Sequence, residues 1–452
     1  MREKAKCVGL FISVILLGSS CVPGEYVPEL KVVQLTAPPA GLMIPEEQTE
    51  QAGPVGKLND TGITLCADDA VQGSYNHDVH CSLLTDMEGD PVPPGQDALS
   101  GRDTIFNDDS DGHAGFSFTK LGVNGLALSI QDQTWDNNGS EPLGSRWSCV
   151  KDNVTGLVWE ITQSADNTYL SSQLGERVQK ANHAGWCGAT DWRLPTMQEL
   201  RSIMDFSYRD PAIDTSYFPD TNGEYWSAMP EKHDDDGLII KGSGSVNFRE
   251  GNSGKVSSDT ISLKSVRLVY GPLLGAGAGL DKLAGVQCTN ENITPTTPAH
   301  HFIFHPDGTV AHTPSGLMWK RCLEGQVFTD NNTPDDPQDD QCVGYATDNM
   351  PWAVALNHVQ TLDAQGGFAG YADWRIPNIK ELESIVEFCR SDPAFNTAVF
   401  PDSAYSLWSS SPVMNDAEPY WVWVLHFRFG VVTQALQGDI NNKAIRLVRT
   451  ME

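Results

Sequence analysis

Residues 191–220 read DWRLPTMQELRSIMDFSYRDPAIDTSYFPD, and residues 373–402 read DWRIPNIKELESIVEFCRSDPAFNTAVFPD. The two stretches are identical at 16 of 30 positions, with a constant offset of 182. A repeat of this length indicates two copies of one fold. Shorter matches flank both stretches: TGLVW at 155–159 with SGLMW at 315–319, and SVRLV at 265–269 with AIRLV at 444–448.

Each copy predicts a short helix just after the proline of its DWRxP motif. Thr196 with Glu199, and Asn378 with Glu381, have the spacing of a capping box. Apolar residues then recur at i, i+3, i+6 and i+7, which places them on one face of a helix. These residues are Met197, Leu200, Ile203 and Met204 in the first copy, and Ile379, Leu382, Ile385 and Val386 in the second.

The second copy also predicts an earlier helix and a hairpin. Trp352, Leu356 and Val359 have helical spacing, and residues 420–429 (YWVWVLHFRF) alternate as a strand before a turn at Gly430. We therefore predict an α+β protein: two tandem domains, each with two helices flanking short antiparallel strands.

The composition is that of an acidic folded protein. The chain has 452 residues, 40% of them apolar, and its 59 acidic and 30 basic residues give a formal net charge of −29. This apolar content excludes wholesale disorder. A nucleic-acid partner is not expected, because phosphates would be repelled and no basic stripe offsets the charge.

The first residues have the pattern of an export signal. Arg2, Lys4 and Lys6 precede an apolar run at 8–17 that is too short to span a bilayer as a helix. Small residues then lead into Cys21, which resembles the lipid-attachment cysteine of bacterial lipoproteins. We predict a signal peptide at 1–20, lipid on Cys21 and a Pro/Glu-rich tether at 21–59, with membrane attachment by the lipid anchor only.

Ordinary signal-peptide cleavage without lipid is the alternative, because Leu17 stands four residues before Cys21 rather than three. Removing residues 1–20 takes away three cations and one anion, so the net charge becomes −31.

The cysteines indicate disulfides. Ten are present, and eight remain without Cys7 and Cys21. An even number in an exported chain is typical of a disulfide framework, and the absence of a C-x-x-C pair disfavours a metal-thiolate cluster. Their order suggests the pairs Cys66–Cys81, Cys149–Cys187, Cys322–Cys342 and Cys288–Cys389.

The ordered motifs TGLxW, DWRxP, xEL, WSS and a closing VRLV together resemble the Legionella collagen-like protein C-terminal family, the Lcl C-terminal domain. The resemblance implies a C-type-lectin-like fold, a location at the surface or in the envelope, and adhesion or polysaccharide binding in some members. Residues 101–124 are expected to supply part of the opening of the first copy. We divide the rest of the chain into an N-terminal extension at 60–147, repeat 1 at 148–270, a linker at 271–287 and repeat 2 at 288–452.

The repeated Asp-Trp-Arg motif suggests structural latches more than a catalytic trio. A guanidinium can form a bidentate pair with a carboxylate or stack on a tryptophan ring, and buried ionised groups are usually paired. We therefore expect an Asp–Arg pair beside a tryptophan in each repeat, and further latches at Arg267 and Arg446. The residues of the two motifs are Asp191, Trp192, Arg193, Asp373, Trp374 and Arg375.

Two acidic stretches are candidates for calcium. Residues 107–112 (NDDSDG) partly match a calcium loop, but Phe118 stands where a bidentate Glu is needed. Residues 330–340 (DNNTPDDPQDD) are also rich in oxygen ligands. Solvated acidic loops are the simpler interpretation, so calcium is possible and no cofactor is required. The candidate ligands are Asn107, Asp109, Asp111, Asp330, Asp335 and Asp336.

No catalytic motif is visible in the sequence, so we expect a binding protein that is not an enzyme. Tandem lectin-like domains favour an adhesin-like protein that recognises polysaccharide with avidity. Tyr420, Trp421 and Trp423 are the candidates for stacking on sugar rings. Alternation places Trp421 and Trp423 on one face of the strand and Tyr420 on the other, so one face belongs to the core.

The charge of the mature chain favours neutral glycans over polyanions. The alternative function is a structural or assembly lipoprotein that docks an envelope protein. The expected location is the outer membrane or cell surface, or the periplasm or medium if Cys21 carries no lipid.

Overall fold

The structure is a computed structural model of the chain. The predicted signal peptide, Cys21 and almost all of the predicted tether lie outside the described residues. The structure describes residues 58–451 except 69–78, 84, 86–88, 90, 101–110, 137–140, 142–145, 162–166, 220, 222, 229–243, 250, 252–262, 273–287, 289–294, 331–336, 338, 403–405, 415–419 and 442.

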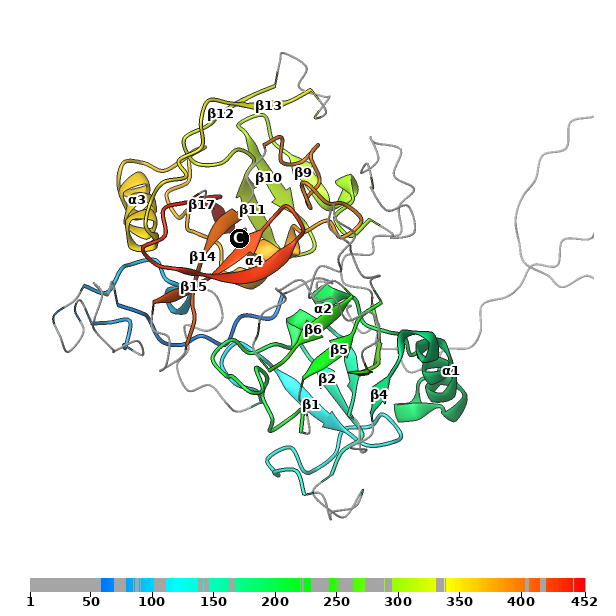
Figure 1. Ribbon diagram of the computed structural model, residues 1–452. Helices are drawn as coiled ribbons and strands as arrows, with labels where there is room; N and C mark the ends of the chain where they lie inside the picture. The colour runs from blue at the N-terminus through cyan, green and yellow to red at the C-terminus, as the bar shows by residue number, and fades with distance from the viewer. Residues whose placement is uncertain are drawn as a thin grey trace, which may run out of the picture. The chain divides into compact units, whose positions relative to one another are not determined.

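The described chain is mostly β with few helices (Figure 1), and repeat 1, together with one strand from the N-terminal extension, forms two four-stranded sheets. One sheet has the strand order β1-β2-β3-β8 and the other has the order β4-β7-β5-β6. The strand that opens the first sheet, β1, lies within residues 101–124. The bounds are β1 (Phe118–Leu121), β2 (Cys149–Asp152), β3 (Val158–Glu160), β4 (Thr168–Tyr169), β5 (Glu224–Trp226), β6 (Ser245–Asn247), β7 (Lys264–Ser265) and β8 (Val269–Tyr270).

Repeat 2 also has two four-stranded sheets, of which the first matches repeat 1 in strand order and the second shares three strands with it, and it has one extra two-stranded ribbon. Its sheets have the orders β9-β10-β11-β18 and β16-β15-β14-β17, and the ribbon is β12-β13. The bounds are β9 (Phe302–Phe304), β10 (Thr309–His312), β11 (Leu317–Lys320), β12 (Val327–Thr329), β13 (Gln341–Val343), β14 (Ser406–Pro412), β15 (Trp421–His426), β16 (Val431–Leu436), β17 (Lys443–Ala444) and β18 (Val448–Thr450).

The recurring motifs meet at one place in each repeat. The TGLxW strand pairs with the closing strand, so that Trp159 lies opposite Val269 and Trp319 lies opposite Val448. Both tryptophans are fully buried. The beginning and the end of each repeat are therefore hydrogen-bonded to each other, which explains why both motifs recur together.

The sequence predicted antiparallel strands, but each repeat also contains one parallel pair. In repeat 2, β14 pairs with β17 in parallel, and in repeat 1, β5 pairs with β7 in the same way. A parallel pair needs a crossover connection, and the β15–β16 hairpin supplies it in repeat 2. Period-two alternation predicts a strand but not its direction relative to its neighbours.

Each repeat has one longer and one shorter α-helix. The capping boxes predicted from the sequence are present, since Thr196 accepts from the backbone N–H of Glu199 and Asn378 accepts from that of Glu381. The helices are α1 (Leu174–Ala184), α2 (Met197–Ser202), α3 (Trp352–Ala364) and α4 (Ile379–Ser384), with 3-10 turns η1 (Asp97–Leu99), η2 (Ser171–Gln173), η3 (Trp186–Gly188) and η4 (Ala299–His301).

Helices α2 and α4 contact each other, and residues at equivalent positions of the two repeats meet there. Arg201 forms a buried ion pair with Glu383, and the two positions differ by the repeat offset of 182. Gln198 donates to the backbone carbonyl of Glu383 at 3.2 Å, and Lys380 donates to that of Ser202 at 3.1 Å. One hydrophobic cluster contains residues of both repeats.

Candidate functional site

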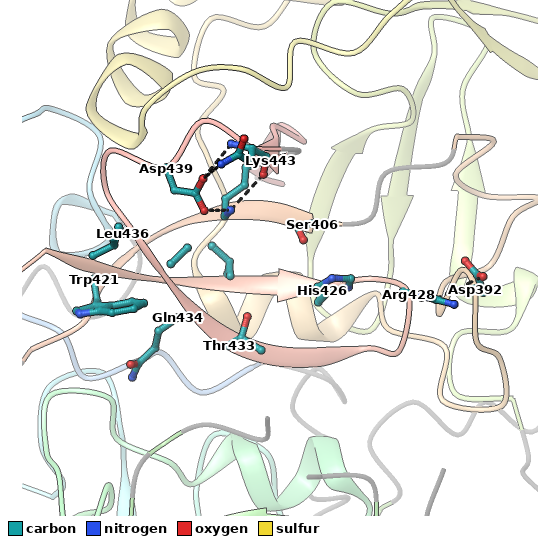
Figure 2. A pocket seen from close by; sticks show the side chains of 13 residues that line it. Asp392, Ser406, Trp421, His426, Arg428, Thr433, Gln434, Leu436, Asp439 and Lys443 are labelled. Atoms are coloured by element: carbon teal, nitrogen blue, oxygen red, sulfur yellow. Dashed lines mark hydrogen bonds and ion pairs between the residues drawn. The ribbon is translucent and has the colours of Figure 1, made fainter. Parts of the chain in front are cut away.

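A groove of about 770 Å³ lies along the sheet of repeat 2 that contains β14, β15 and β16 (Figure 2). Its volume falls within the range of about 300–1,000 Å³ that is typical of small-molecule sites. Thirteen residues line it: Asp392, Ser406, Trp421, Val424, His426, Arg428, Thr433, Gln434, Ala435, Leu436, Asp439, Asn441 and Lys443.

The β15–β16 hairpin positions the apolar part of the groove. Trp421 begins β15 and lies opposite Leu436, the last residue of β16. The turn between the strands requires Gly430, which has a φ of 70° and whose missing Cβ would lie 2.6 Å from a methyl carbon of Val386. Trp421 is partly buried against the core and Leu436 is exposed, so both present apolar surface at the groove.

Two ion pairs make the groove polar without giving it a net charge. Lys443 donates to Asp439 at 2.5 Å, and Nε of Arg428 lies 3.6 Å from a carboxylate oxygen of Asp392. Figure 2 shows the two pairs at different places along the groove. Burial acts to raise the pKa of Asp439, but the hydrogen bonds from Lys443 and Asn441 hold it below its ordinary value. The Asp439 carboxylate is therefore ionised and oriented.

Two buried polar atoms beside the groove lack a protein partner. Neither Nδ1 of His426 nor Nε2 of Gln434 forms a hydrogen bond within the described part of the chain. Burial lowers the pKa of His426, and the nearby charges of Arg428 and Lys443 lower it further. The imidazole is therefore neutral at physiological pH. An unsatisfied buried polar atom costs about 1–3 kcal/mol, and alternation places His426 and Gln434 on opposite faces of the hairpin, so the two atoms do not converge on one point.

The three aromatic residues predicted to bind sugar lie in different surroundings. Trp421 lines the groove, whereas Tyr420 is partly buried and does not line it. Trp423 is only 2% exposed, and its ring packs edge-on against Phe206 at a centroid distance of 5.1 Å. The expectation for Trp423 is therefore corrected: it belongs to the core, because the face of β15 that carries it is covered by the larger hydrophobic cluster.

The predicted latches exist, but with a different acidic partner. Arg193 forms a bidentate pair with Glu199 at 2.7 Å for both bonds, and Arg375 pairs with Glu381 at 2.5 and 2.6 Å. The expected pairing within Asp-Trp-Arg is therefore wrong. The same glutamates also accept the N-cap backbone N–H, so one carboxylate closes the capping box and holds the arginine.

The tryptophans of these motifs are buried, and the aspartates are exposed. Trp192 and Trp374 are almost fully buried. Asp373 accepts a hydrogen bond from Nε of Arg449 at 2.8 Å. Asp191 is exposed. The pKa of the Tyr270 phenol is raised, mainly by burial and further by the nearby charge of Asp191. These residues form the scaffold of the repeats.

The two additional arginines are also buried. Arg446 pairs with Asp402, donates to two backbone carbonyls and lies 4.3 Å from the centre of the Phe400 ring. Arg267 donates to Thr221 at 2.7 Å and lies over the rings of Phe218 and Tyr225.

The calcium candidates are described only in part. Asn107, Asp109, Asp335 and Asp336 lie outside the described residues. Asp111 is exposed and accepts from Ser117 at 2.5 Å, and Asp330 is partly buried at the end of β12. Among the residues that the structure describes, no group of three or more His, Cys, Asp or Glu side chains could hold a metal ion. Calcium binding stays a prediction.

The sequence did not single out most of the groove residues. Asp392, Ser406, His426, Arg428, Gln434, Asp439, Asn441 and Lys443 come from separate segments that only the sheet brings together. Two signals were available in the sequence. His426 and Arg428 are polar residues in an otherwise apolar strand sequence, and Lys443 follows Asp439 at i+4.

Four disulfides join the cysteines in the pairs that their order suggested: Cys66–Cys81, Cys149–Cys187, Cys288–Cys389 and Cys322–Cys342. Disulfides persist in oxidising compartments, which indicates an extracellular or envelope protein. Among the described helices, none combines the length and apolar character needed to cross a bilayer.

The comparisons with known proteins identify one family. No curated protein and no solved structure matches the chain. The sequence model of the Lcl C-terminal domain matches residues 148–270 and 308–449, which together make up more than half of the chain. Both matches contain the TGLxW or SGLMW strand, the DWRxP motif and the closing strand described above. The chain therefore belongs to the Lcl C-terminal domain family and carries two copies of that domain in tandem.

Proposed function

We propose that this protein is an exported, non-enzymatic binding protein that recognises polysaccharide through its tandem domains. The groove of repeat 2 carries the proposal, because it combines an aromatic and apolar wall with several polar groups in a volume suited to a short stretch of sugar. Carbohydrate rings have apolar faces and hydroxyl edges, and Trp421 and the polar residues that line the groove fit these two features.

The charge balance of the groove supports a neutral ligand. Lys443 and Arg428 are each paired with a carboxylate, His426 is neutral and Gln434 is an amide. An anionic sugar would face Asp439 and Asp392, and it would also be repelled by the chain as a whole. The lowered pKa of Asp439 is the opposite of what a general acid needs, which supports binding rather than hydrolysis.

The finer aspects of fold and location belong to the same proposal. We propose that each repeat has a C-type-lectin-like arrangement, supported by the pairing of its first and last strands and by its two helices. Lipid on Cys21 would hold the protein at the outer membrane or cell surface. Two copies of the domain on one chain would raise avidity for a repetitive polymer.

The test is binding of the mature, oxidised protein (residues 22–452) to neutral and anionic polysaccharides, with calcium and with chelator. We expect saturable binding to a neutral polymer, weakened about tenfold by Trp421→Ala, since loss of an aromatic stacking contact costs about 1 kcal/mol or more. Tyr345→Ala is the matched control, because Tyr345 is 95% exposed in the same repeat and lies outside the groove. Absence of binding to every polysaccharide by the folded protein would refute the proposal, as would equal effects of both variants.

A further inference from the structure

A row of three polar residues crosses one sheet of repeat 2 inside the groove. Ser406 of β14 lies directly opposite Lys443 of β17 and directly opposite His426 of β15. Residues that lie opposite each other in neighbouring strands share one face of the sheet. All three line the groove, and Figure 2 shows Ser406 between the other two. We call Lys443, Ser406 and His426 the polar row.

Repeat 1 has an equivalent row that is built from different residues. Glu224 stands at the position of the serine, with the repeat offset of 182. Asn247 lies directly opposite Glu224 and takes the position of the histidine. Lys264 directly precedes the closing SVRLV motif and takes the position of the lysine, which directly precedes AIRLV. The lysine is therefore common to both rows, and the other two positions differ.

The side chains of the repeat 1 row bind one another and the backbone. Nζ of Lys264 lies 3.6 Å from a carboxylate oxygen of Glu224 and donates to the hydroxyl of Ser245 at 3.1 Å. Ser245 donates in turn to the same carboxylate at 3.3 Å. The side-chain oxygen of Asn247 accepts from the backbone N–H of Arg249 at 2.8 Å. The polar groups of this row are therefore already engaged within the chain.

The polar row of repeat 2 has no such internal closure. Lys443 turns away from the row, because it donates to Asp439 at 2.5 Å and to the backbone carbonyl of Asn441 at 3.2 Å. Nδ1 of His426 is buried and forms no hydrogen bond within the described residues. Burial, and then the nearby cations, lower the pKa of His426, so its neutral ring offers one N–H donor and one nitrogen acceptor. Ser406 adds a short hydroxyl where repeat 1 has a carboxylate.

We propose that Ser406 and His426 form a subsite that binds a hydroxyl group of a neutral sugar, and that Glu224 closes the equivalent position in repeat 1. A sugar hydroxyl both donates and accepts, and a serine hydroxyl and a neutral imidazole can match both roles. Directly opposite residues have Cβ atoms about 4.5–5.5 Å apart, so one ligand hydroxyl can reach both side chains.

The inference rests on the polysaccharide binding proposed above and narrows it. Each chain has one such subsite, and it belongs to repeat 2. Any avidity between the two repeats then requires a different surface of repeat 1.

The experiment titrates the oxidised mature protein with maltohexaose, cellohexaose and mannohexaose by isothermal titration calorimetry. We expect at least one of these neutral oligosaccharides to bind at one site per chain. Ser406→Glu should weaken this binding about tenfold, because its carboxylate would cover the face of the sheet as Glu224 does in repeat 1. His426→Asn should weaken it to a similar extent, because the shorter amide would bond to the backbone as Asn247 does. Both variants copy residues that the equivalent row of repeat 1 already accommodates.

Glu224→Gln is the matched control, because it changes the equivalent position of repeat 1 and should leave the affinity unchanged. Near-ultraviolet circular dichroism would check that each variant is folded.

Three results would overturn the proposal. The first is no binding of any of the three oligosaccharides, and the second is two equal sites per chain. The third is an affinity that Ser406→Glu and His426→Asn leave unchanged, or that Glu224→Gln weakens as much as they do. Polymer binding that depends on Trp421 but not on the polar row would refute this subsite alone, whereas absence of polymer binding would refute the proposed function as well.

Discussion

The buried ion pair between Arg446 and Asp402 offers a sharp test of how the repeat is stabilised. Their side chains are 2% and 0% exposed, and Arg446 also donates to the backbone carbonyls of Lys320 and Arg321. Replacing Asp402 by Asn leaves the guanidinium buried without its counter-charge. We expect Asp402→Asn to lower the free energy of unfolding by about 3 kcal/mol, because breaking a buried pair by removing one partner typically costs that much.

The control is a less deeply buried ion pair of the same repeat. Lys443 and Asp439 are 10% and 27% exposed, so Asp439→Asn should cost about 0.2–1 kcal/mol. Urea unfolding of the oxidised protein, followed by tryptophan fluorescence, would measure both variants against the wild type. The denaturant slope must stay constant for the midpoints to be compared.

A double replacement separates the charge from the packing. Oδ1 of Asp402 and Nε of Arg446 have no hydrogen-bond partner in the part of the chain that the structure describes, so the pair is incompletely satisfied. We expect Asp402→Leu/Arg446→Met to be less destabilising than Asp402→Asn, because two apolar groups leave no buried charge. The reasoning is refuted if Asp402→Asn costs no more than Asp439→Asn, or if the double replacement is the most damaging of the three.

Two further predictions concern pH and helix capping. Burial, and then the charge of Asp60, raises the pKa of Asp97 to about 7. Because the folded protein binds this proton more tightly than the unfolded chain does, the free energy of unfolding falls as pH rises from about 4 to 7. The stability of the wild type should therefore fall relative to Asp97→Asn across that window, on the order of 4 kcal/mol, and a constant difference in urea midpoints would contradict this. Glu381→Ala removes both the acceptor of the N-cap backbone N–H of α4 and the partner of Arg375, so it should cost about 3 kcal/mol in thermal or urea unfolding. The exposed first-turn residue Glu176 is its control, and Glu176→Ala should cost less than about 0.5 kcal/mol.

Local patterns predicted the local structure well. The capping boxes of α2 and α4 could be predicted because an N-cap residue and the third residue of the helix are fixed by sequence spacing alone. The order of the cysteines suggested the disulfides because each pair falls within one presumptive unit of the chain. The repeat itself indicated tandem domains of one family.

Contacts between distant segments could not be predicted in the same way. Arg193 is adjacent to Trp192 and two residues from Asp191, yet its long side chain reaches Glu199 six residues ahead. Trp421 and Trp423 lie on one face of β15, but Trp423 is buried in the core cluster, whereas Trp421 is only partly buried against it and lines the groove. The groove requires the register of β15 with β16 and the position of β17, and these are set by the folded sheet.

The contact between α2 and α4 depends on a charge difference between the two repeats. Arg201 and Glu383 occupy the same position of the duplicated sequence and carry opposite charges where they meet. Two copies of the first half joined in this way would bring arginine against arginine, and two copies of the second would bring glutamate against glutamate. Like charges in a buried contact are strongly unfavourable. At this contact the two copies of the duplicated sequence have therefore become complementary in charge.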